Sequence, residues 1–273
     1  MKSVLVITQD PDFHVLPVQS EVNKRGFTMQ HMNLADFPLK MSLSAHLGDG
    51  EKGTWTSLFD TFTSIWHRRP ELYHASTDLN TETRKFLERE AYYAFVGLIE
   101  SSNSFLVSSP TAIQHATFKA IYLAKAKQLG INVPRTLITN EPDRARDFFD
   151  QCDGKIICKT IYDNMIKGDN NNYPQNIYTT IITKDHLNQM DNVSQAAHLF
   201  QKAIIDCRDI RVTIFGTRCI ATEIIYTESR SHVDWRTEYQ KHTYIQGCCK
   251  VGNKIRRAGI KCVKYLFPWF SRT

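Results

Sequence analysis

The sequence lacks the long apolar segments and the cysteine pattern that would mark a membrane or secreted protein. No apolar run approaches the roughly 20 residues of a membrane span, and the four apolar residues at 4–7 are too few for a signal-peptide core. The seven cysteines are an odd number without paired metal-ligand spacing, which favours reduced thiols. We therefore expect a cytoplasmic protein with no membrane span.

Several catalytic motifs are also missing. There is no Gly-x-x-x-x-Gly-Lys phosphate loop and no Gly-x-Ser-x-Gly nucleophile elbow. No two of the ten histidines stand at the His-x-x-x-His spacing of a helical metal site. These absences exclude P-loop nucleotide binding and give no support to a hydrolase elbow or a zinc site.

Acidic residues are absent from residues 239–273, which carry eight Lys or Arg. Without those eight, the basic count falls from 34 to 26, against 28 acidic residues in the whole chain. The net charge of +6 therefore belongs to this C-terminal stretch. Because the rest of the chain is nearly neutral, we expect it to have no nucleic-acid partner.

What is present is ordinary globular composition, with 42% hydrophobic and 23% charged residues over 273 positions, enough for about two domains. Strand and helix patterns alternate in the first hundred residues. The spacing predicts strands over 3–9, 27–32 and 59–66, helices over 14–25 and 81–100, and a long loop over 38–53. In the helix over 81–100, one face is expected to carry Leu87, Ala91, Ala94 and Leu98. This alternation favours an α/β fold with a mostly parallel sheet.

A second unit is expected to begin near Ser109. Its predicted elements are a helix over 118–129, a helix from 141 with Asn140 as its N-cap, strands over 133–139, 154–162 and 177–183, and a hairpin over 209–225. The segment 163–176 is polar and rich in asparagine, so we expect a mobile loop there.

Lys159 stands out because it lies within an apolar strand, where an ammonium is costly to bury without an anion or an acceptor. Either the strand is an edge and the lysine reaches solvent, or the ammonium is directed at a bound phosphate. Lys119, near the start of a predicted helix, is a second candidate cation, although by itself it is typical of a surface lysine.

Asp209 and Arg211 are two residues apart in a predicted strand and so share one face of it. They form either an exposed ion pair or one wall of a polar site. Arg236 follows Trp235, and two such arginines could hold phosphate or carboxylate oxygens through paired hydrogen bonds. The motif at 66–69, Trp-His-Arg-Arg, has no assigned role, and we expect a strand end that packs between domains.

Taken in order, these pieces resemble the ATP-grasp ligases, and specifically the ribosomal-peptide maturases that cross-link microviridin-type precursors (graspetides). The segments that carry the resemblance are 65–70, Lys119, 128–142, 159–160, 177–180, 199–201, 209–213 and 234–236. It runs from residue 1 to about residue 244. It implies an α/β ATP-grasp architecture with a pre-ATP-grasp domain at 1–110, a first lobe at 111–197, an incomplete second lobe at 198–247 and a divergent basic tail at 248–273.

The resemblance also implies roles for individual residues. Lys119 and Lys159 match the lysines that reach the nucleotide phosphates. Gln201, Lys202 and Ile204 fall in the hinge that holds the adenine. Arg211 and Arg236 match catalytic arginines that face the phosphates and the acyl group.

The implied activity is an ATP-dependent peptide ligase that uses ATP and Mg²⁺. A side-chain carboxylate of a ribosomal precursor peptide becomes an acyl phosphate, and a hydroxyl or an amine then displaces phosphate to form an ω-ester or ω-amide crosslink. The implied partners are a precursor peptide with its leader and a second copy in a homodimer.

The sequence departs from the family at its C-terminal end. The family's magnesium ligands, an Asp and then a Glu-x-Asn pair, follow the Asp-Trp-Arg segment, but no acidic residue follows Glu238 here, so no metal ligand is assigned. We expect either a truncated or frame-altered ligase, a basic and aromatic interaction tail, or a structural role for 248–273. The alternative function is a catalytically impaired homologue that binds the leader peptide or the nucleotide.

Overall fold

A computed structural model describes residues 2–48, 55–71, 73–162, 165–166, 175–205, 209–226 and 242–245. Contacts along the chain divide it into two compact units, Met1–His115 and Ala116–Thr273. Arg236, the tail at 248–273 and most of the predicted loop at 163–176 lie outside the described residues. The four-part division of the chain made from the sequence stays a prediction.

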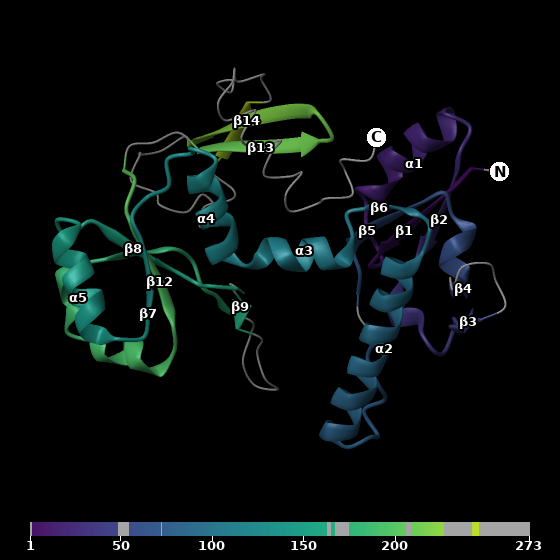
Figure 1. Cartoon of the computed structure of the whole chain (residues 1–273), viewed down its shortest axis with the longest axis horizontal. Coiled ribbons are helices and arrows are strands. Elements are labelled where there is room, and N and C mark those ends of the chain that lie inside the picture. The colour runs from purple at the N-terminus through teal and green to yellow at the C-terminus, as the bar shows by residue number, and fades with distance from the viewer. Residues whose placement is uncertain are drawn as a thin grey trace. The chain divides into compact units, whose positions relative to one another are not determined.

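The first unit is built on a four-stranded sheet in which every pair is parallel, in the order β2-β1-β5-β6. Its larger elements are β1 (Ser3–Thr8), α1 (Val15–Lys24), β2 (Thr28–Met32), β5 (Ser64–Arg69), α2 (Thr81–Ser101) and β6 (Phe105–Val107). Figure 1 shows them in purple to blue. The parallel α/β layer predicted from the alternation of strand and helix patterns is confirmed.

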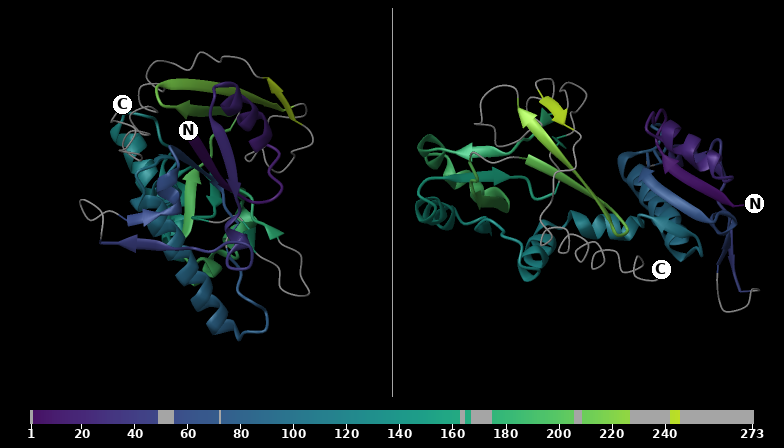
Figure 2. Two further views of the ribbon diagram at one scale, coloured as in Figure 1. Left: turned by 90° about the vertical axis from the view of Figure 1, so that its right-hand side faces the viewer. Right: turned by 90° about the horizontal axis from the view of Figure 1, so that it is seen from above.

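Helices cover both faces of this sheet, with α1 on one side and α2 on the other (Figure 2, right). Leu5, Ile7 and Ile65 form a core with the buried face of α2. On the opposite face of β1, Val6 is also fully buried. Because both faces of a strand in such a sheet are covered, β1 is a continuous apolar run rather than an alternating one.

The buried face of α2 matches the predicted one in part, since Ala91 is buried and Leu98 packs against the core. Its buried residues are Ala91, Phe95 and Ile99, whereas Ala94 is exposed. Both sets of residues have helical spacing, so periodicity alone could not choose between them. The structure buries the face that carries a phenylalanine, which removes more apolar area from water.

Two short elements occupy sequence that was predicted otherwise. The loop predicted over 38–53 contains β3 (Ala45–Leu47), which pairs antiparallel with β4 (Trp55–Ser57). The strand predicted from residue 59 begins instead as a 3-10 turn over Leu58–Thr61, capped by Ser57 and Asp60. The glycines of 48–53 have Gly-x-Gly-x-x-Gly spacing, but they join two antiparallel strands rather than a strand and a helix, so they are not a dinucleotide fingerprint.

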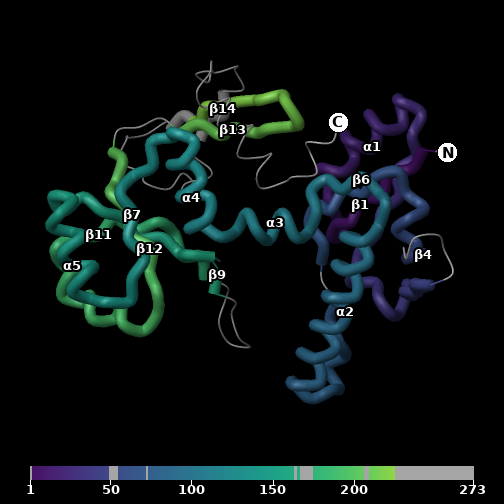
Figure 3. Tube along the Cα trace, viewed as in Figure 1, coloured from purple at the N-terminus to yellow at the C-terminus, as the bar shows by residue number. Residues whose placement is uncertain are grey.

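The second unit contains a four-stranded antiparallel sheet in the order β11-β8-β12-β7. Its larger elements are α4 (Lys119–Gln128), β7 (Thr136–Thr139), α5 (Pro142–Gln151), β8 (Ile156–Lys159), β11 (Thr180–Ile182) and β12 (His198–Lys202). The boundary between the two units falls within α3 (Pro110–Thr117). Helix α5 lies against one face of the sheet (Figure 3), where Phe148, Phe149, Ile156 and Phe200 form the core.

A separate three-stranded antiparallel sheet is formed by β13 (Asp209–Phe215), β14 (Arg218–Tyr226) and β15 (His242–Ile245). The predicted hairpin is confirmed, and it turns at Gly216, whose φ of 57° favours glycine. Within the segment predicted as a mobile loop, β9 (Met165–Ile166) pairs with β10 (Gln175–Asn176). In the part of the chain that the structure describes, no helix is long and apolar enough to span a bilayer.

Candidate functional site

The sheet of the second unit has one face on the α5 core and a second face that carries polar side chains. Because neighbouring side chains along a strand point to opposite faces, Lys159 shares its face with Ile157, two residues earlier. Leu199 pairs with Lys159, and Gln201 pairs with Ile157, so both lie on this same face. The face opposite the α5 core therefore brings a lysine and a glutamine from two strands together.

A cavity of about 280 Å³ opens on this face. Its lining comes from α4, from the segment before β7 and from strands β8 and β12, namely Lys119, Tyr122, Leu123, Pro134, Lys159, Leu199 and Gln201. All of these belong to the second unit. The cavity thus joins four segments that the sequence separates by up to about eighty residues.

Lys159 is the last residue of β8, an interior strand that lies between β11 and β12, and it pairs with Leu199 of β12. This placement contradicts the alternative in which Lys159 sits on an edge strand. The Lys159 Nζ donates a hydrogen bond of 3.1 Å to the Gln201 Oε1, and both residues line the cavity. An ammonium at the wall of a partly apolar cavity favours an anionic occupant.

Lys119 is the first residue of α4, and its Nζ donates a 2.7 Å hydrogen bond to the carbonyl oxygen of Ile161, just beyond β8. The chain therefore holds this second ammonium beside the strand that carries Lys159. Two cations forty residues apart in sequence line one cavity. Lys119 thus donates to a backbone carbonyl and Lys159 to an amide side chain, and both residues line the cavity.

The remaining lining is amphipathic. Gln201 is buried, at 6% exposure, and its Nε2 donates a 2.9 Å hydrogen bond to the Thr136 Oγ1. Burial raises the pKa of the Tyr122 phenol, so this ring stays neutral at physiological pH. Leu199 and Leu123 complete an apolar wall. Such a cavity suits a ligand with an anionic group and a flat, less polar part.

No protein-family model matches this sequence, and no curated protein does. Solved structures do match it. The macrocyclase MdnC from Microcystis aeruginosa MRC, bound with its precursor peptide MdnA, aligns with a TM-score of 0.81 at 20% identity, over 97% of this chain and 84% of that chain. A Chryseobacterium gregarium RiPP-associated ATP-grasp ligase, in complex with ADP and a leader and core peptide, aligns with a TM-score of 0.83 at 22% identity. The alignment covers 97% of this chain and 82% of that chain. The ATP-grasp ligase PsnB, complexed with minimal precursor, Mg and ADP, aligns with a TM-score of 0.68 at 20% identity. The alignment covers 97% of this chain and 80% of that chain.

The chain has the ATP-grasp fold. The fold expected from the sequence resemblance is therefore confirmed, because these likenesses extend over nearly the whole chain. At about one identical residue in five, they establish the architecture and leave the chemistry to be argued from the residues.

Two of the residues that the sequence assigned to the ATP-grasp hinge do not line the cavity. Lys202 follows Gln201 and so points to the opposite face of the sheet, where its Nζ lies 3.8 Å from the Asp153 Oδ2. Ile204 lies beyond the end of β12 and is 59% exposed. The backbone here is tied to its neighbours, since the Ala203 N–H donates to the Lys155 carbonyl at 2.8 Å.

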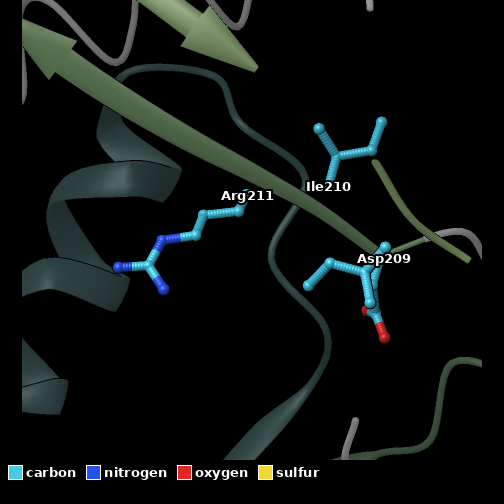
Figure 4. A pocket seen from close by; sticks show the side chains of 4 residues that line it. Asp209, Ile210 and Arg211 are labelled. Atoms are coloured by element: carbon cyan, nitrogen blue, oxygen red, sulfur yellow. The ribbon is translucent and has the colours of Figure 1, made fainter. Parts of the chain in front are cut away.

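Arg211 lies on the three-stranded sheet, beside a shallow pocket of about 290 Å³ lined by Asp209, Ile210, Arg211 and Ile224. In Figure 4 the guanidinium of Arg211 extends away from the carboxylate of Asp209. The pocket differs from the cavity at Lys159, with which it shares no residue. The other predicted catalytic arginine, Arg236, is outside the described residues.

The described part of the ATP-grasp chain offers no set of magnesium ligands. Among the described residues there is no cluster of three His, Cys, Asp or Glu that could hold a metal ion. The cavity lining also contains no carboxylate. Since Mg²⁺ takes hard oxygen ligands, the described residues do not by themselves form a site for this ion.

Two polar residues were missed in the sequence, namely Tyr122 in the cavity lining and Thr136, which contacts Gln201 but does not line the cavity. Tyr122 is three residues after Lys119, and this spacing on a helix places both side chains on one face. Thr136 lies in the segment that carried the resemblance, but its contact with Gln201 spans 65 residues of sequence. Tyr122 could have been found from helical spacing, whereas Thr136 could be found only from the pairing of β7 with β12.

Proposed function

We propose that this chain is an ATP-dependent peptide ligase that activates side-chain carboxylates of a ribosomal precursor peptide. The observation that carries the proposal is the pair of ammonium groups, Lys119 and Lys159, at one cavity of an ATP-grasp fold. A nucleoside triphosphate supplies the anion that such a pair of cations favours. The proteins similar in structure include one in complex with ADP and a leader and core peptide.

In this proposal the two lysines hold the phosphates, and the buried Gln201 with the residues up to Ile204 holds the base. Arg211 and Arg236 are proposed to face the transferring phosphoryl group and the acyl group, where a guanidinium can hold two oxygens at once. ATP and Mg²⁺ are the proposed cofactors, without an assigned metal ligand. The proposed partners are the precursor peptide with its leader and a second copy of the chain.

The proposed reaction has two balanced steps. An oxygen of the peptide carboxylate attacks the γ-phosphorus of ATP, the bond from that phosphorus to the bridging oxygen breaks, and ADP leaves. A Ser or Thr hydroxyl or a Lys amine then attacks the acyl carbon, loses its proton, and expels inorganic phosphate. The product is an ω-ester or ω-amide, and the peptide has lost one water overall. The residues of the chain contribute positioning and charge neutralisation to both steps.

The test is to incubate the chain with Mg-ATP and a candidate precursor whose core carries Thr, Asp and Glu. We expect the peptide to lose about 18 Da, one water, per crosslink in mass spectrometry. Lys159→Ala should abolish both ATP binding and the mass loss while the fold is retained. Lys155→Ala is the matched control, because Lys155 is exposed and lies just before β8.

The outcomes of this test distinguish a peptide ligase from a binding protein. Peptide or nucleotide binding without loss of mass would support the alternative, a leader-peptide or nucleotide-binding protein that does not catalyse. Unchanged ATP affinity in Lys159→Ala would refute the assignment of the cavity. Treatment with mild alkali distinguishes the products, since an ester crosslink reopens and an amide crosslink does not.

A further inference from the structure

Three polar side chains form a continuous hydrogen-bonded chain behind the cavity. The Lys159 Nζ donates to the Gln201 Oε1 at 3.1 Å, and the Gln201 Nε2 donates to the Thr136 Oγ1 at 2.9 Å. The Thr136 hydroxyl in turn donates to the Pro134 carbonyl oxygen at 2.9 Å. Thr136 lies opposite Gln201 in the pairing of β7 with β12, so the sheet itself sets this contact.

The direction of every hydrogen bond in this chain follows from the lysine. An ammonium can only donate, so the atom of Gln201 that faces Lys159 must be its oxygen. The amide nitrogen then faces Thr136, whose oxygen must accept. Its hydroxyl proton is therefore free to go to the Pro134 carbonyl, which can only accept. No other assignment of the amide satisfies all four groups.

We propose that Thr136 is a positioning residue, which locks the amide of Gln201 so that its oxygen holds the ammonium of Lys159 at the cavity wall. Thr136 is not among the residues that line the cavity, and so it acts through Gln201. A buried amide that loses its acceptor is costly, and Gln201 is only 6% exposed. Without the hydroxyl, the amide nitrogen of Gln201 loses its acceptor, and the side chain can turn away from Lys159 to reach another one.

Lys119 provides an internal reference for this proposal. Its ammonium bonds to the carbonyl oxygen of Ile161, a backbone group that does not depend on Thr136. A change at Thr136 should therefore alter the environment of Lys159 and leave that of Lys119 unaltered. A general loosening of the fold would affect both lysines.

The experiment measures the acetylation rate of each lysine by acetic anhydride, with peptide mass spectrometry, in the full chain without nucleotide. Thr136→Val keeps the shape and removes the hydroxyl, and we expect it to raise the ratio of Lys159 to Lys119 labelling about threefold to tenfold. Thr136→Ser keeps the hydroxyl and should restore the ratio. An unchanged ratio in Thr136→Val, or an equal rise in Thr136→Ser, would overturn the inference.

A second variant keeps the test decisive if Thr136→Val fails to fold. Gln201→Met removes the amide that links the two residues, and the labelling ratio should rise at least as far. A ratio equal to that of the unchanged chain would also overturn the inference.

The consequence for nucleotide affinity rests on the proposed function, and it is measured separately. Thr136→Val should weaken ATP binding about tenfold, and it should have no further effect in a Lys159→Ala background if it acts only through that lysine. If Mg-ATP fails to protect Lys159 of the unchanged chain from acetylation, the proposed function is wrong. The labelling ratio without nucleotide then still decides the role of Thr136.

Discussion

The ammonium of Lys159 is tolerated in a partly apolar environment because the Gln201 amide oxygen, 3.1 Å away, accepts its hydrogen bond. The free energy that a buried charge costs is reduced by such an acceptor but is not cancelled, so the site remains receptive to an anion. The lysine is therefore tolerated in the absence of a ligand and available to one. At the residue scale, this is the feature on which the proposed activity depends.

Asp12 illustrates a charge that the fold has satisfied completely. Its carboxylate accepts a hydrogen bond of 2.6 Å from the Arg68 Nε, and it also accepts from the Thr8 hydroxyl and the His14 backbone N–H. The Arg68 guanidinium is the main reason that the pKa of Asp12 falls to about 2. The motif at 66–69 thus has a structural task at the carboxyl end of β5.

The pH dependence of stability should follow from this carboxylate. Because the pKa in the folded state is below the ordinary value of 3.8, the ionised form stabilises the fold at neutral pH. That contribution should be lost as the pH falls from about 4 to about 2. Asp12→Asn should lower the free energy of unfolding by about 1 to 2 kcal/mol at neutral pH, measured by urea denaturation.

The matched control is Glu21→Gln, which breaks an exposed ion pair of α1 with Lys24. Exposed pairs of this kind contribute under about 1 kcal/mol, so this variant should unfold nearly as the unchanged chain does. If the difference between Asp12→Asn and the unchanged chain stayed constant down to pH 2, the assignment of the low pKa would be wrong.

At the scale of elements, the turn from α5 into β8 positions Lys159. Gly154 has a φ of 70°, and a Cβ added there would lie 3.2 Å from the Phe149 Cζ. Phe149 belongs to the core between α5 and the sheet. The turn therefore requires glycine both for its backbone conformation and for its close approach to an aromatic ring.

Gly154→Ala should lower the free energy of unfolding by about 1 to 2 kcal/mol, because an L-residue in this conformation is strained and the methyl meets the ring. Chemical denaturation followed by circular dichroism measures the change. Gly97→Ala is a control that should change the free energy of unfolding in the opposite direction. Gly97 lies within α2 with open space around it, so alanine should stabilise by about 0.5 to 1 kcal/mol. If Gly154→Ala left the free energy of unfolding unchanged, the turn would have relaxed to accept the methyl group.

At the scale of the whole molecule, the chain consists of two units with separate cores. One core is centred on Leu5, Ile65 and Phe95, and the other on Phe149, Ile156 and Phe200. All residues that line the cavity belong to the second unit. Stability and nucleotide binding should therefore be separable properties of the two parts.

We expect residues 1–115, produced alone, to unfold in one cooperative transition on heating, because their parallel sheet and its core are complete. Residues 116–273 should keep the ATP affinity of the whole chain within about threefold, as measured by calorimetry. Lys159→Ala in the 116–273 fragment is the control. A fragment that folds but binds ATP much more weakly would show that the first unit contributes to the site.

Much of the local structure could be predicted from the sequence, but the contacts between distant elements could not. The strand at 3–9 is marked by its short apolar run and the hairpin at 209–225 by its alternation, and both were confirmed. The spacing in α2 was correct and the face was correct in part, since Ala91 is buried but Phe95 rather than Ala94 lies in the core. For the site, Lys119 and Lys159 could be named, whereas Thr136 could not, because nothing local connects it with Gln201.

By itself, the sequence determined where the longer strands and helices form and which side chains share a face of their own element, because these follow from apolar patterning and backbone periodicity. Only the tertiary structure decided that β8 is an interior strand, that Lys119 and Lys159 line one cavity, and that Gln201 lies opposite Thr136. Strand order and register depend on contacts between residues far apart in the chain. Such contacts form only when each element buries its apolar face against another.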